Sequence, residues 1–331
     1  MKTWKTRIGA VFFLLTAILI NRFFKVEWKM EQPKEKIPVV RYTLISNLKG
    51  AYWDDIALGA TQQAKNMGVS LKCVTLANNT KEGMVAQIDY ALAVDSDGLI
   101  LMGYLGTQSG IDAVARAREA GVPVIAVDAC SPEARVNALI GSDNIQAGRM
   151  AAKALAAVTG EKACVLAVAY SHTAKTQNDR IRGFKQELDE NYKDIKLVQT
   201  IVDGGDMYIL RKNLEEALHE FSAVNAIICV GASSSDMLGN VAAVKPKLGD
   251  EIKVICFDTS ENIYRFIQEG VYDATIAQNP VEMGKQAICV LEDIRDGRKM
   301  ENQVIYTPLQ TLKRENLAER DGQGEAEWIV Y

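Results

Sequence analysis

Histidine is scarce in this sequence. Only two histidines, His172 and His219, occur among 331 residues. Neither belongs to an HExxH motif or to a Cys/His cluster with metal-ligand spacing, so a zinc or di-metal centre would need carboxylates almost alone. We therefore expect no metal site.

Basic residues do not form long runs either. Beyond the first 30 positions no Lys/Arg block is longer than a few residues, and the net charge is -4, which argues against a nucleic-acid-binding role. Hydrophobic residues make up 48% and charged residues 24% of the chain, a balance typical of soluble globular proteins. At roughly 100 to 200 residues per domain, the length predicts two compact domains that need no disulfides.

The loops of common enzyme and cofactor sites are also missing. The sequence has no GxGxxG that opens a helix, no GxxxxGK[ST] and no GxSxG, so neither a cofactor nor an enzymatic activity is expected. Gly103-x-x-Gly106 is a weak match to a phosphate loop and is predicted to be a turn. The six cysteines are scattered and are predicted to be small buried hydrophobic residues, although a disulfide stays open.

The amino terminus has the layout of an export signal. Basic residues among the first seven precede an apolar run over residues 8–20, and neither a small-x-small cleavage site nor a lipoprotein cysteine follows. Residues 1–24 are therefore predicted to be an uncleaved signal-anchor, and residues 25–38 a polar tether to an extracytoplasmic folded part. The alternatives are an atypical cleaved signal and a cytoplasmic protein with an apolar tail.

Beyond the tether, short apolar runs alternate with amphipathic segments. Runs such as Gly98–Met102 predict buried parallel strands, and apolar residues at three- and four-residue spacing predict the helices between them. Gly68, Gly121 and Gly270 stand where a helix end favours a left-handed residue. The same rhythm restarts after Gly160, which predicts an α/β fold with two doubly wound parallel-sheet domains.

A long helix is predicted from Pro280, capped by Asn279, to about Arg295. All the strands predicted for the second unit come before this helix, so we expect the helix to return to the first unit. The two predicted domains comprise residues 39–143 with 280–305, and residues 144–279 with 306–331.

Ligands of open α/β sheets bind beyond the carboxyl ends of the strands, so the residues just past the apolar runs are the binding candidates. In this sequence they are polar, with two adjacent aromatic residues, Tyr52 and Trp53. Aromatic rings pack on C–H faces, while Asp, Asn, Gln and Arg exchange hydrogen bonds with hydroxyl groups. The pattern is typical of a site for a small polar, hydroxylated molecule.

Short motifs follow one another along the chain: Tyr52-Trp53, Gly121-Val122-Pro123-Val124-Ile125-x-x-Asp128, Gly141-Ser142-Asp143-Asn144, Arg180-x-x-Gly183-Phe184, Phe257-Asp258 and Ala274-Thr275-Ile276-Ala277-Gln278. In this order they resemble the ribose-type periplasmic sugar-binding proteins, whose ligand-binding domain is shared with lactose-type repressors. The resemblance implies the periplasmic binding protein type I fold, in which a three-crossover hinge joins two domains.

The resemblance also implies residue roles in the first motifs. Tyr52 and Trp53 resemble the aromatic pair that sandwiches the sugar, and Asp128 and Asp258 resemble carboxylates that accept hydrogen bonds from its hydroxyls. Core aromatics and plain helix caps are the structural alternatives.

Further candidates lie around the predicted hinge and in the second unit. Arg180 is similar to the family's sugar-clamping arginine, with a surface salt bridge as the alternative, and Gln278 is similar to a hinge-proximal glutamine. Asn144 is a secondary candidate whose alternative role is helix capping. The family's second-domain asparagine falls at Ser233 or Ser234.

The departures from the family pattern concern hydrogen-bond donors. Ala129 stands where the ribose proteins have an arginine, and their early asparagine falls at Gly50. Asp203-Gly204-Gly205-Asp206 occupies the region of their second-domain aromatic residue. These changes put D-ribose itself in doubt, and His172 is a candidate for a replacement contact, with an ordinary loop histidine as the alternative.

The resemblance implies a non-enzymatic receptor that closes over a sugar or polyol and presents it to an ABC transporter permease. A tethered ligand-sensing receptor for a sensor histidine kinase is the alternative. A lactose-type repressor would require a helix-turn-helix where this chain has an apolar segment and a tether, and an enzyme would require a nucleophile or cofactor loop.

Overall fold

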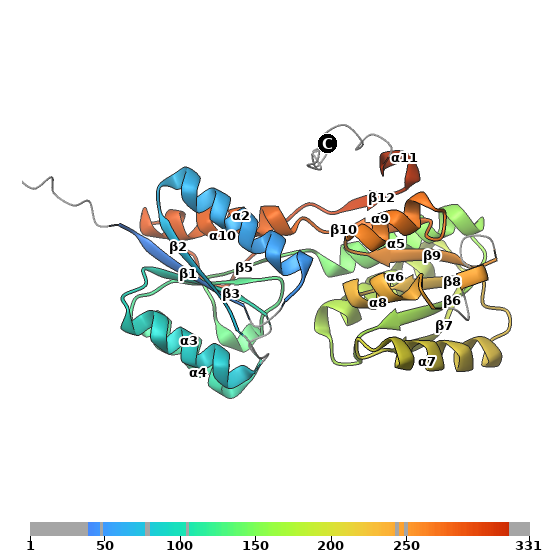
Figure 1. Cartoon of the computed structure of the whole chain (residues 1–331), viewed down its shortest axis with the longest axis horizontal. Helices are drawn as coiled ribbons and strands as arrows, with labels where there is room; N and C mark the ends of the chain where they lie inside the picture. The colour runs from blue at the N-terminus through green and yellow to red at the C-terminus, as the bar shows by residue number, and fades with distance from the viewer. Residues whose placement is uncertain are drawn as a thin grey trace, which may run out of the picture. The chain divides into compact units, whose positions relative to one another are not determined.

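Six parallel strands form the first sheet, in the order β11-β5-β4-β3-β1-β2 (Figure 1). Strands β3 and β4 are buried along their whole length because helices cover both faces, α2 and α10 on one and α3 and α4 on the other. The strands are β1 (Arg41–Ser46), β2 (Ser70–Thr75), β3 (Gly98–Met102), β4 (Val124–Val127), β5 (Ala138–Gly141) and β11 (Gln303–Tyr306). The helices are α2 (Ala51–Met67), α3 (Lys81–Ala93), α4 (Gln108–Glu119), α10 (Pro280–Arg295) and the 3-10 turn η1 (Pro132–Ala134). We call this sheet with its helices the first lobe.

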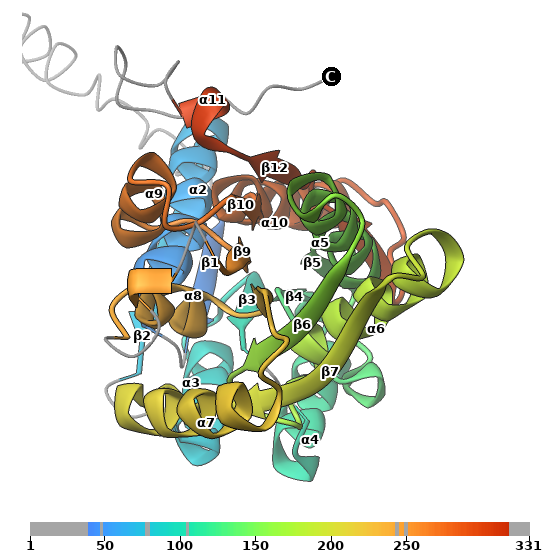
Figure 2. The same ribbon diagram turned by 90° about the vertical axis from the view of Figure 1, so that its right-hand side faces the viewer.

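The second sheet has the order β12-β10-β9-β8-β6-β7, with β12 antiparallel to β10 and the other strands parallel. Helices α5 and α6 pack on one face, around Phe184, and α7, α8 and α9 pack on the other, around Phe266 (Figure 2). The strands are β6 (Ala163–Ala169), β7 (Ile195–Val202), β8 (Ala226–Cys229), β9 (Lys253–Phe257), β10 (Ala274–Ala277) and β12 (Gln310–Leu312). The helices are α5 (Asn144–Thr159), α6 (Lys175–Asn191), α7 (Met207–Glu220), α8 (Ala232–Leu238), α9 (Glu261–Gln268), α11 (Arg314–Leu317) and the 3-10 turn η2 (Lys245–Lys247). This is the second lobe.

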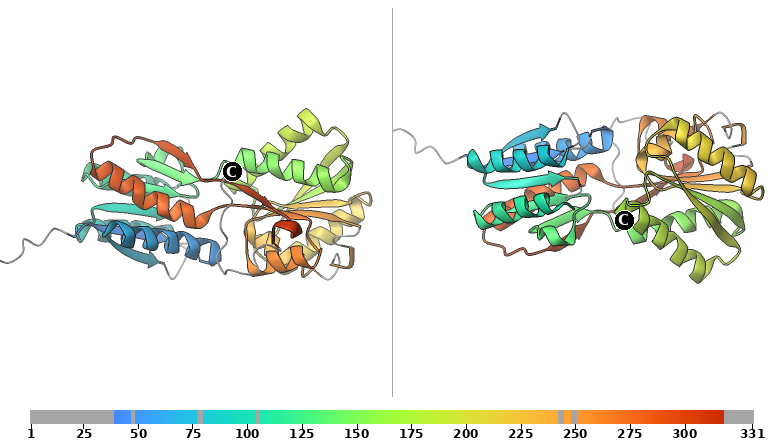
Figure 3. Two further views of the ribbon diagram at one scale, coloured as in Figure 1. Left: turned by 90° about the horizontal axis from the view of Figure 1, so that it is seen from above. Right: turned by 90° about the horizontal axis from the view of Figure 1, so that it is seen from below.

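The chain passes between the two sheets after β5, after β10 and after β11 (Figure 3). The predicted α/β fold with two doubly wound sheets is therefore confirmed, and the long helix α10 returns to pack against α2 as predicted. Gly68, Gly121 and Gly270 have the positive φ expected at helix ends.

The structure is a computed structural model that describes residues 39–46, 49–76, 80–103, 106–241, 245–247 and 251–317. The predicted anchor over residues 1–24, the tether and part of the Gly103–Gly106 turn lie outside these residues. Within the described part of the chain, no helix is long and apolar enough to cross a membrane.

Two predictions of local structure need correction. The sequence pattern predicts a helix over about residues 234–244, whereas α8 spans Ala232–Leu238. Cys73 is exposed on the edge strand β2, whereas the prediction of a buried residue holds for Cys130, Cys229 and Cys256. All six cysteines are free.

Glycine allows paired helices to approach each other at backbone contact. A Cβ atom on Gly183 of α6 would lie 2.0 Å from the carbonyl oxygen of Ile145 in α5, and one on Gly148 of α5 would lie 1.9 Å from the carbonyl oxygen of Arg180. The first lobe repeats this arrangement, with Gly59 of α2 facing α10 and Gly284 of α10 facing α2. The approach of α6 to α5 brings the backbone of Arg180 to the amino-terminal end of α5.

Candidate functional site

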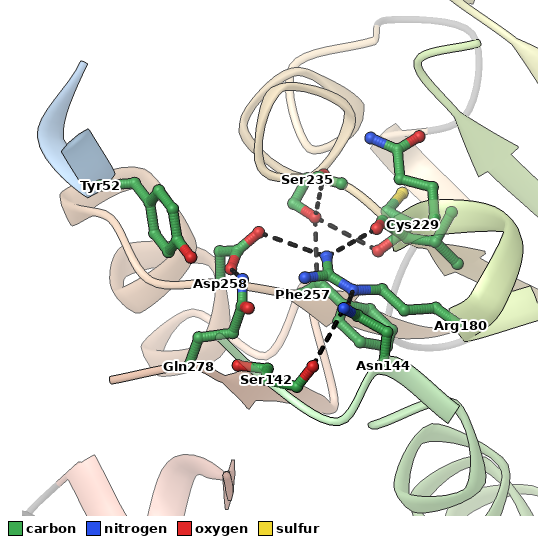
Figure 4. Close-up of polar contacts among 12 residues, drawn as sticks. Tyr52, Ser142, Asn144, Arg180, Cys229, Ser235, Phe257, Asp258 and Gln278 are labelled. Atoms are coloured by element: carbon green, nitrogen blue, oxygen red, sulfur yellow. Dashed lines mark hydrogen bonds and ion pairs between the residues drawn. The ribbon is translucent and has the colours of Figure 1, made fainter. Parts of the chain in front are cut away.

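Arg180 lies at the centre of a buried polar cluster in the second lobe, and only 4% of its surface is exposed (Figure 4). Its Nε donates to Oδ1 of Asn144 at 2.8 Å, and its Nη1 donates to the carbonyl oxygen of Val230 at 2.9 Å. The guanidinium group lies 4.6 Å from the ring centroid of Phe257. These contacts fix the cation in one orientation.

Asp258 is the carboxylate beside this arginine. Its Oδ2 lies 3.6 Å from Nη1 of Arg180, and its Oδ1 accepts a short hydrogen bond from Nε2 of Gln278. The residue follows β9 with a φ of 68°, a left-handed conformation that Asp adopts more readily than most residues. Its backbone N–H donates to Ile276 in the neighbouring β10 at 3.0 Å, so the turn is held by the sheet.

Asp128 has the corresponding place in the first lobe. It follows β4 with a φ of 74°, and its N–H donates to the carbonyl oxygen of Ile140 in β5 at 2.8 Å. Its Oδ1 accepts from the hydroxyl of Tyr52 at 2.9 Å. Non-glycine residues in this conformation are concentrated at functional sites.

Tyr52 and Trp53 form the first turn of α2. Their rings meet edge to face, with centroids 5.0 Å apart and planes at 89°. Both side chains are half-buried, so the pair keeps apolar surface for a ligand. Gly50 precedes the helix with a φ of 118°, which favours glycine at that position.

The ionisable groups of the two lobes influence one another. Burial raises the pKa of the Asp128 carboxyl, and Asp258 raises it further, whereas Tyr52 and Arg180 lower it. The pKa of Tyr52 lies well above its ordinary value because the ring is desolvated and Asp128 and Asp258 disfavour a phenolate. Tyr52 is therefore a hydrogen-bond donor at neutral pH.

Asn144, a secondary candidate for ligand binding, contacts Arg180. Asn144 does not cap α5, because Oδ1 of Asp143 accepts from the N–H of Gln146; Asn144 instead links Arg180 to the carbonyl oxygen of Ser142.

Ser234 is fully buried and donates to Asp203, while Ser233 is half-buried. His172 is exposed, and its carbonyl oxygen accepts from Nδ2 of Asn178 at 2.7 Å. The hydroxyl of Ser234 therefore already donates its hydrogen bond within the protein. Ser233 and the ring of His172 remain candidates for ligand contacts.

Ser142 and Asp236 lie in segments just past the apolar runs, where binding residues are expected, but neither was singled out as a ligand contact. The hydroxyl of Ser142 is buried at the first crossover and has no hydrogen-bond partner in the part of the chain that the structure describes. Asp236 in α8 accepts a short hydrogen bond from Ser260, and Asp258 contributes to raising its pKa after burial. In the sequence, Asp236 directly follows three consecutive serines at the start of α8. That position, close to the carboxyl end of β8, was the signal that could have identified Asp236.

No group of three or more His, Cys, Asp or Glu within the described ranges is arranged to hold a metal ion. What the cluster offers is a fixed guanidinium, two carboxylates on strand ends, a tyrosine hydroxyl and an aromatic pair. Together these groups suit the hydrogen bonding and C–H packing of a polyhydroxylated molecule.

The chain belongs to the periplasmic binding protein domain family, whose model matches residues 42–299. The ribose import binding protein of Bacillus subtilis (strain 168) is 26% identical over 265 residues, which are 80% of this chain and 84% of the relative. That of Escherichia coli (strain K12) is 24% identical over 78% of this chain and 85% of its own length. These matches confirm the predicted resemblance to ribose-type periplasmic sugar-binding proteins.

Solved structures agree with this assignment. GanP, a glucose-galactose binding protein from Geobacillus stearothermophilus, is 26% identical and superposes with a TM-score of 0.76 over 84% of this chain and 99% of its own. A chain of the XylFII-LytSN complex is also 26% identical, with a TM-score of 0.70 over 84% of this chain and 98% of its own.

Proposed function

We propose that the protein is an extracytoplasmic solute-binding protein, not an enzyme, that closes over a sugar or polyol between its two lobes. The proposed domains are residues 39–143 with 280–305 and residues 144–279 with 306–331. The proposed ligand contacts are Tyr52, Trp53, Asp128, Arg180, Asp258 and Gln278, with Asn144, Ser233 and His172 as further candidates.

One observation carries the proposal. Each lobe presents an aspartate in a left-handed turn directly after a central strand, Asp128 after β4 and Asp258 after β9. Arg180 and Tyr52 stand beside these carboxylates as donors. A ligand that accepts from the donors and donates to both carboxylates would stabilise the closed arrangement of the lobes through its differential contacts.

The relatives support the chemical class of the ligand. They include proteins named for ribose import and for glucose and galactose binding. A binding protein of this kind delivers its ligand to the permease of an ABC transporter, which we propose as the partner.

A sensor histidine kinase is the second candidate partner. It is favoured by the likeness to XylFII in its complex with LytSN and by the anchor predicted over residues 1–24, which would keep the receptor at the membrane. Deletion of the gene distinguishes the partners: loss of sugar uptake indicates a permease, and loss of sugar-induced transcription with uptake intact indicates a kinase.

A thermal-shift screen tests the proposed ligand class. The full chain in mild detergent is screened against pentoses, hexoses, deoxy sugars and polyols, with nucleosides and amino acids for comparison. A ligand at about 100 times its Kd stabilises the folded state by about 2.7 kcal/mol, which raises the midpoint measurably. A shift with sugars or polyols supports the proposal, and shifts confined to nucleosides or amino acids contradict it.

A further inference from the structure

The candidate site holds more carboxylates than cations. Asp258 acts electrostatically on both Asp128 and Asp236. Arg180 is the buried cation of the cluster, and Lys49, exposed ahead of α2, is the next basic residue along the chain from Tyr52. Even if both cations are counted against the three carboxylates, negative charge is in excess.

The guanidinium group of Arg180 interacts mainly with groups of the second lobe. Two of its nitrogens donate to Asn144 and to the carbonyl oxygen of Val230, and it lies within ion-pair distance of Asp258. Asp128 and Asp236 each accept one hydrogen bond, from Tyr52 and from Ser260, and neither forms an ion pair among the described residues. Burial makes an unpaired carboxylate costly, and both pKa values are raised accordingly.

A second observation at the same site is the unpartnered hydroxyl of Ser142. This side chain is 5% exposed, and its Oγ has no hydrogen-bond partner in the described structure. Ser142 lies two residues before Asn144, and its carbonyl oxygen accepts a hydrogen bond from Nδ2 of Asn144, so it belongs to the Arg180 cluster (Figure 4). A hydroxyl oxygen without a donor can accept a hydrogen bond from a ligand.

An ammonium group matches these vacant acceptors. It offers three hydrogen-bond donors and no acceptor, and its positive charge offsets the excess of carboxylates. A neutral hydroxyl at the same place satisfies the hydrogen bonds and leaves the charge uncompensated. The aromatic pair Tyr52 and Trp53 and the donors on Arg180 and Gln278 still require a ligand with C–H faces and hydroxyl groups.

We propose that the ligand is a polyhydroxylated amine, that is, an amino sugar or amino polyol, whose ammonium group is held by Asp128. This inference rests on the proposed function and specifies its ligand class. The position after Asp128 is central to it, because Ala129 places no cation there.

Matched ligand pairs test the inference by isothermal titration calorimetry of the full chain at pH 7. The pairs are D-glucosamine with D-glucose, D-galactosamine with D-galactose, and D-glucamine with D-sorbitol, and N-acetyl-D-glucosamine serves as the uncharged amide control. We expect at least one amine to bind about tenfold or more tightly than its neutral partner, with the N-acetyl compound behaving like the neutral sugar.

Two variants locate the effect. Asp128→Asn keeps an acceptor for Tyr52 and tolerates the left-handed turn, and should remove most of the preference for the amine. Ala129→Arg introduces a cation next to Asp128, and this variant should prefer the neutral sugar over the amine. Circular dichroism spectra matching those of the wild type show that both variants fold.

The outcomes separate this inference from the proposed function. Neutral sugars that bind as tightly as their amines overturn the inference and leave the sugar receptor standing. An amine preference that both folded variants retain overturns the assignment to Asp128. No binding of any member of the panel overturns the inference alone when the thermal-shift screen has found another sugar, and overturns the proposed sugar site as well when that screen has found none.

Discussion

Arg180 connects three separate parts of the second lobe. It lies on α6, reaches Asn144 at the start of α5 and Val230 just after β8, and lies over the ring of Phe257 in β9. Since one buried cation is held by so many neighbours, its position is fixed before any ligand arrives, and little ordering is required on binding.

Replacing Arg180 tests this role. Arg180→Gln removes a charged donor, and we expect the Kd of the identified ligand to rise about 10- to 100-fold, since hydrogen bonds to charged groups contribute about 1.5–3 kcal/mol. Arg182→Gln is the matched control, because Arg182 is on the same helix with a 61% exposed side chain paired to Asp179. Calorimetry that gives equal Kd values for the two variants would refute the role of Arg180.

The raised pKa of Asp128 predicts a pH dependence of stability. The folded protein binds this proton more tightly than the unfolded chain does, so the group's contribution to the free energy of unfolding decreases as pH rises from 3.8 through the raised pKa. The side chain of the Asp128→Asn variant does not ionise, so its free energy of unfolding does not decrease with pH for this reason. Its stability relative to the wild type should therefore increase between pH 4 and pH 7, measured by urea denaturation without ligand. A difference that stays constant or decreases with pH contradicts the prediction.

Several candidate residues were predictable one by one, but not their connections. Asp128, Asp258 and Gln278 were recognisable because each directly follows a strand, where the ends of parallel strands converge. The partner of Asn144 was not predictable: Asp143 and Asn144 are both good cap residues, and only the approach of α6 shows that Asn144 contacts Arg180. Likewise, the hydrogen bond that Ser234 donates to Asp203 joins segments that are distant in the sequence, so it was not predictable.

At the scale of elements, the glycines between α5 and α6 control where Arg180 lies. Gly183→Ala would put a Cβ 2.0 Å from a backbone oxygen that cannot move without its helix. We expect a loss of about 1–3 kcal/mol or more in the free energy of unfolding, together with weaker ligand binding because Arg180 is displaced.

The exposed Lys185 on the same helix provides the control. Lys185→Ala should leave both the unfolding midpoint and the Kd unchanged. If thermal denaturation shows Gly183→Ala to be as stable as Lys185→Ala, the close packing of the two helices is not required.

Elements with a strong apolar pattern were predictable, whereas three short strands were not. The predicted bounds of α10 agree with the structure, since a cap, a proline at the first turn and apolar spacing all coincide there. Strands β5, β11 and β12 contain only four, four and three residues, too few for a periodic signal. They become strands because each adds to the open edge of a neighbour, β5 to β4, β11 to β5 and β12 to β10, which is a tertiary effect.

At the scale of the whole molecule, the three crossovers should permit the lobes to move as bodies. A ligand that contacts both Asp128 and Asp258 favours closure, so the radius of gyration from small-angle X-ray scattering should decrease at saturating ligand. The Arg180→Gln variant at the same ligand concentration should show a smaller decrease. An unchanged radius in the wild type at proven saturation would contradict closure.

Sugar binding at the Arg180 cluster is the central requirement of the proposed function. The most direct measurement is isothermal titration calorimetry of the full chain with the best ligand of the thermal-shift screen, beside Arg180→Gln and Arg182→Gln. We expect the wild type and Arg182→Gln to bind one sugar or polyol, charged or neutral, per chain, and Arg180→Gln to bind it with greatly reduced affinity. Binding that is unaffected by Arg180→Gln, or no binding of any sugar, would contradict the proposed function.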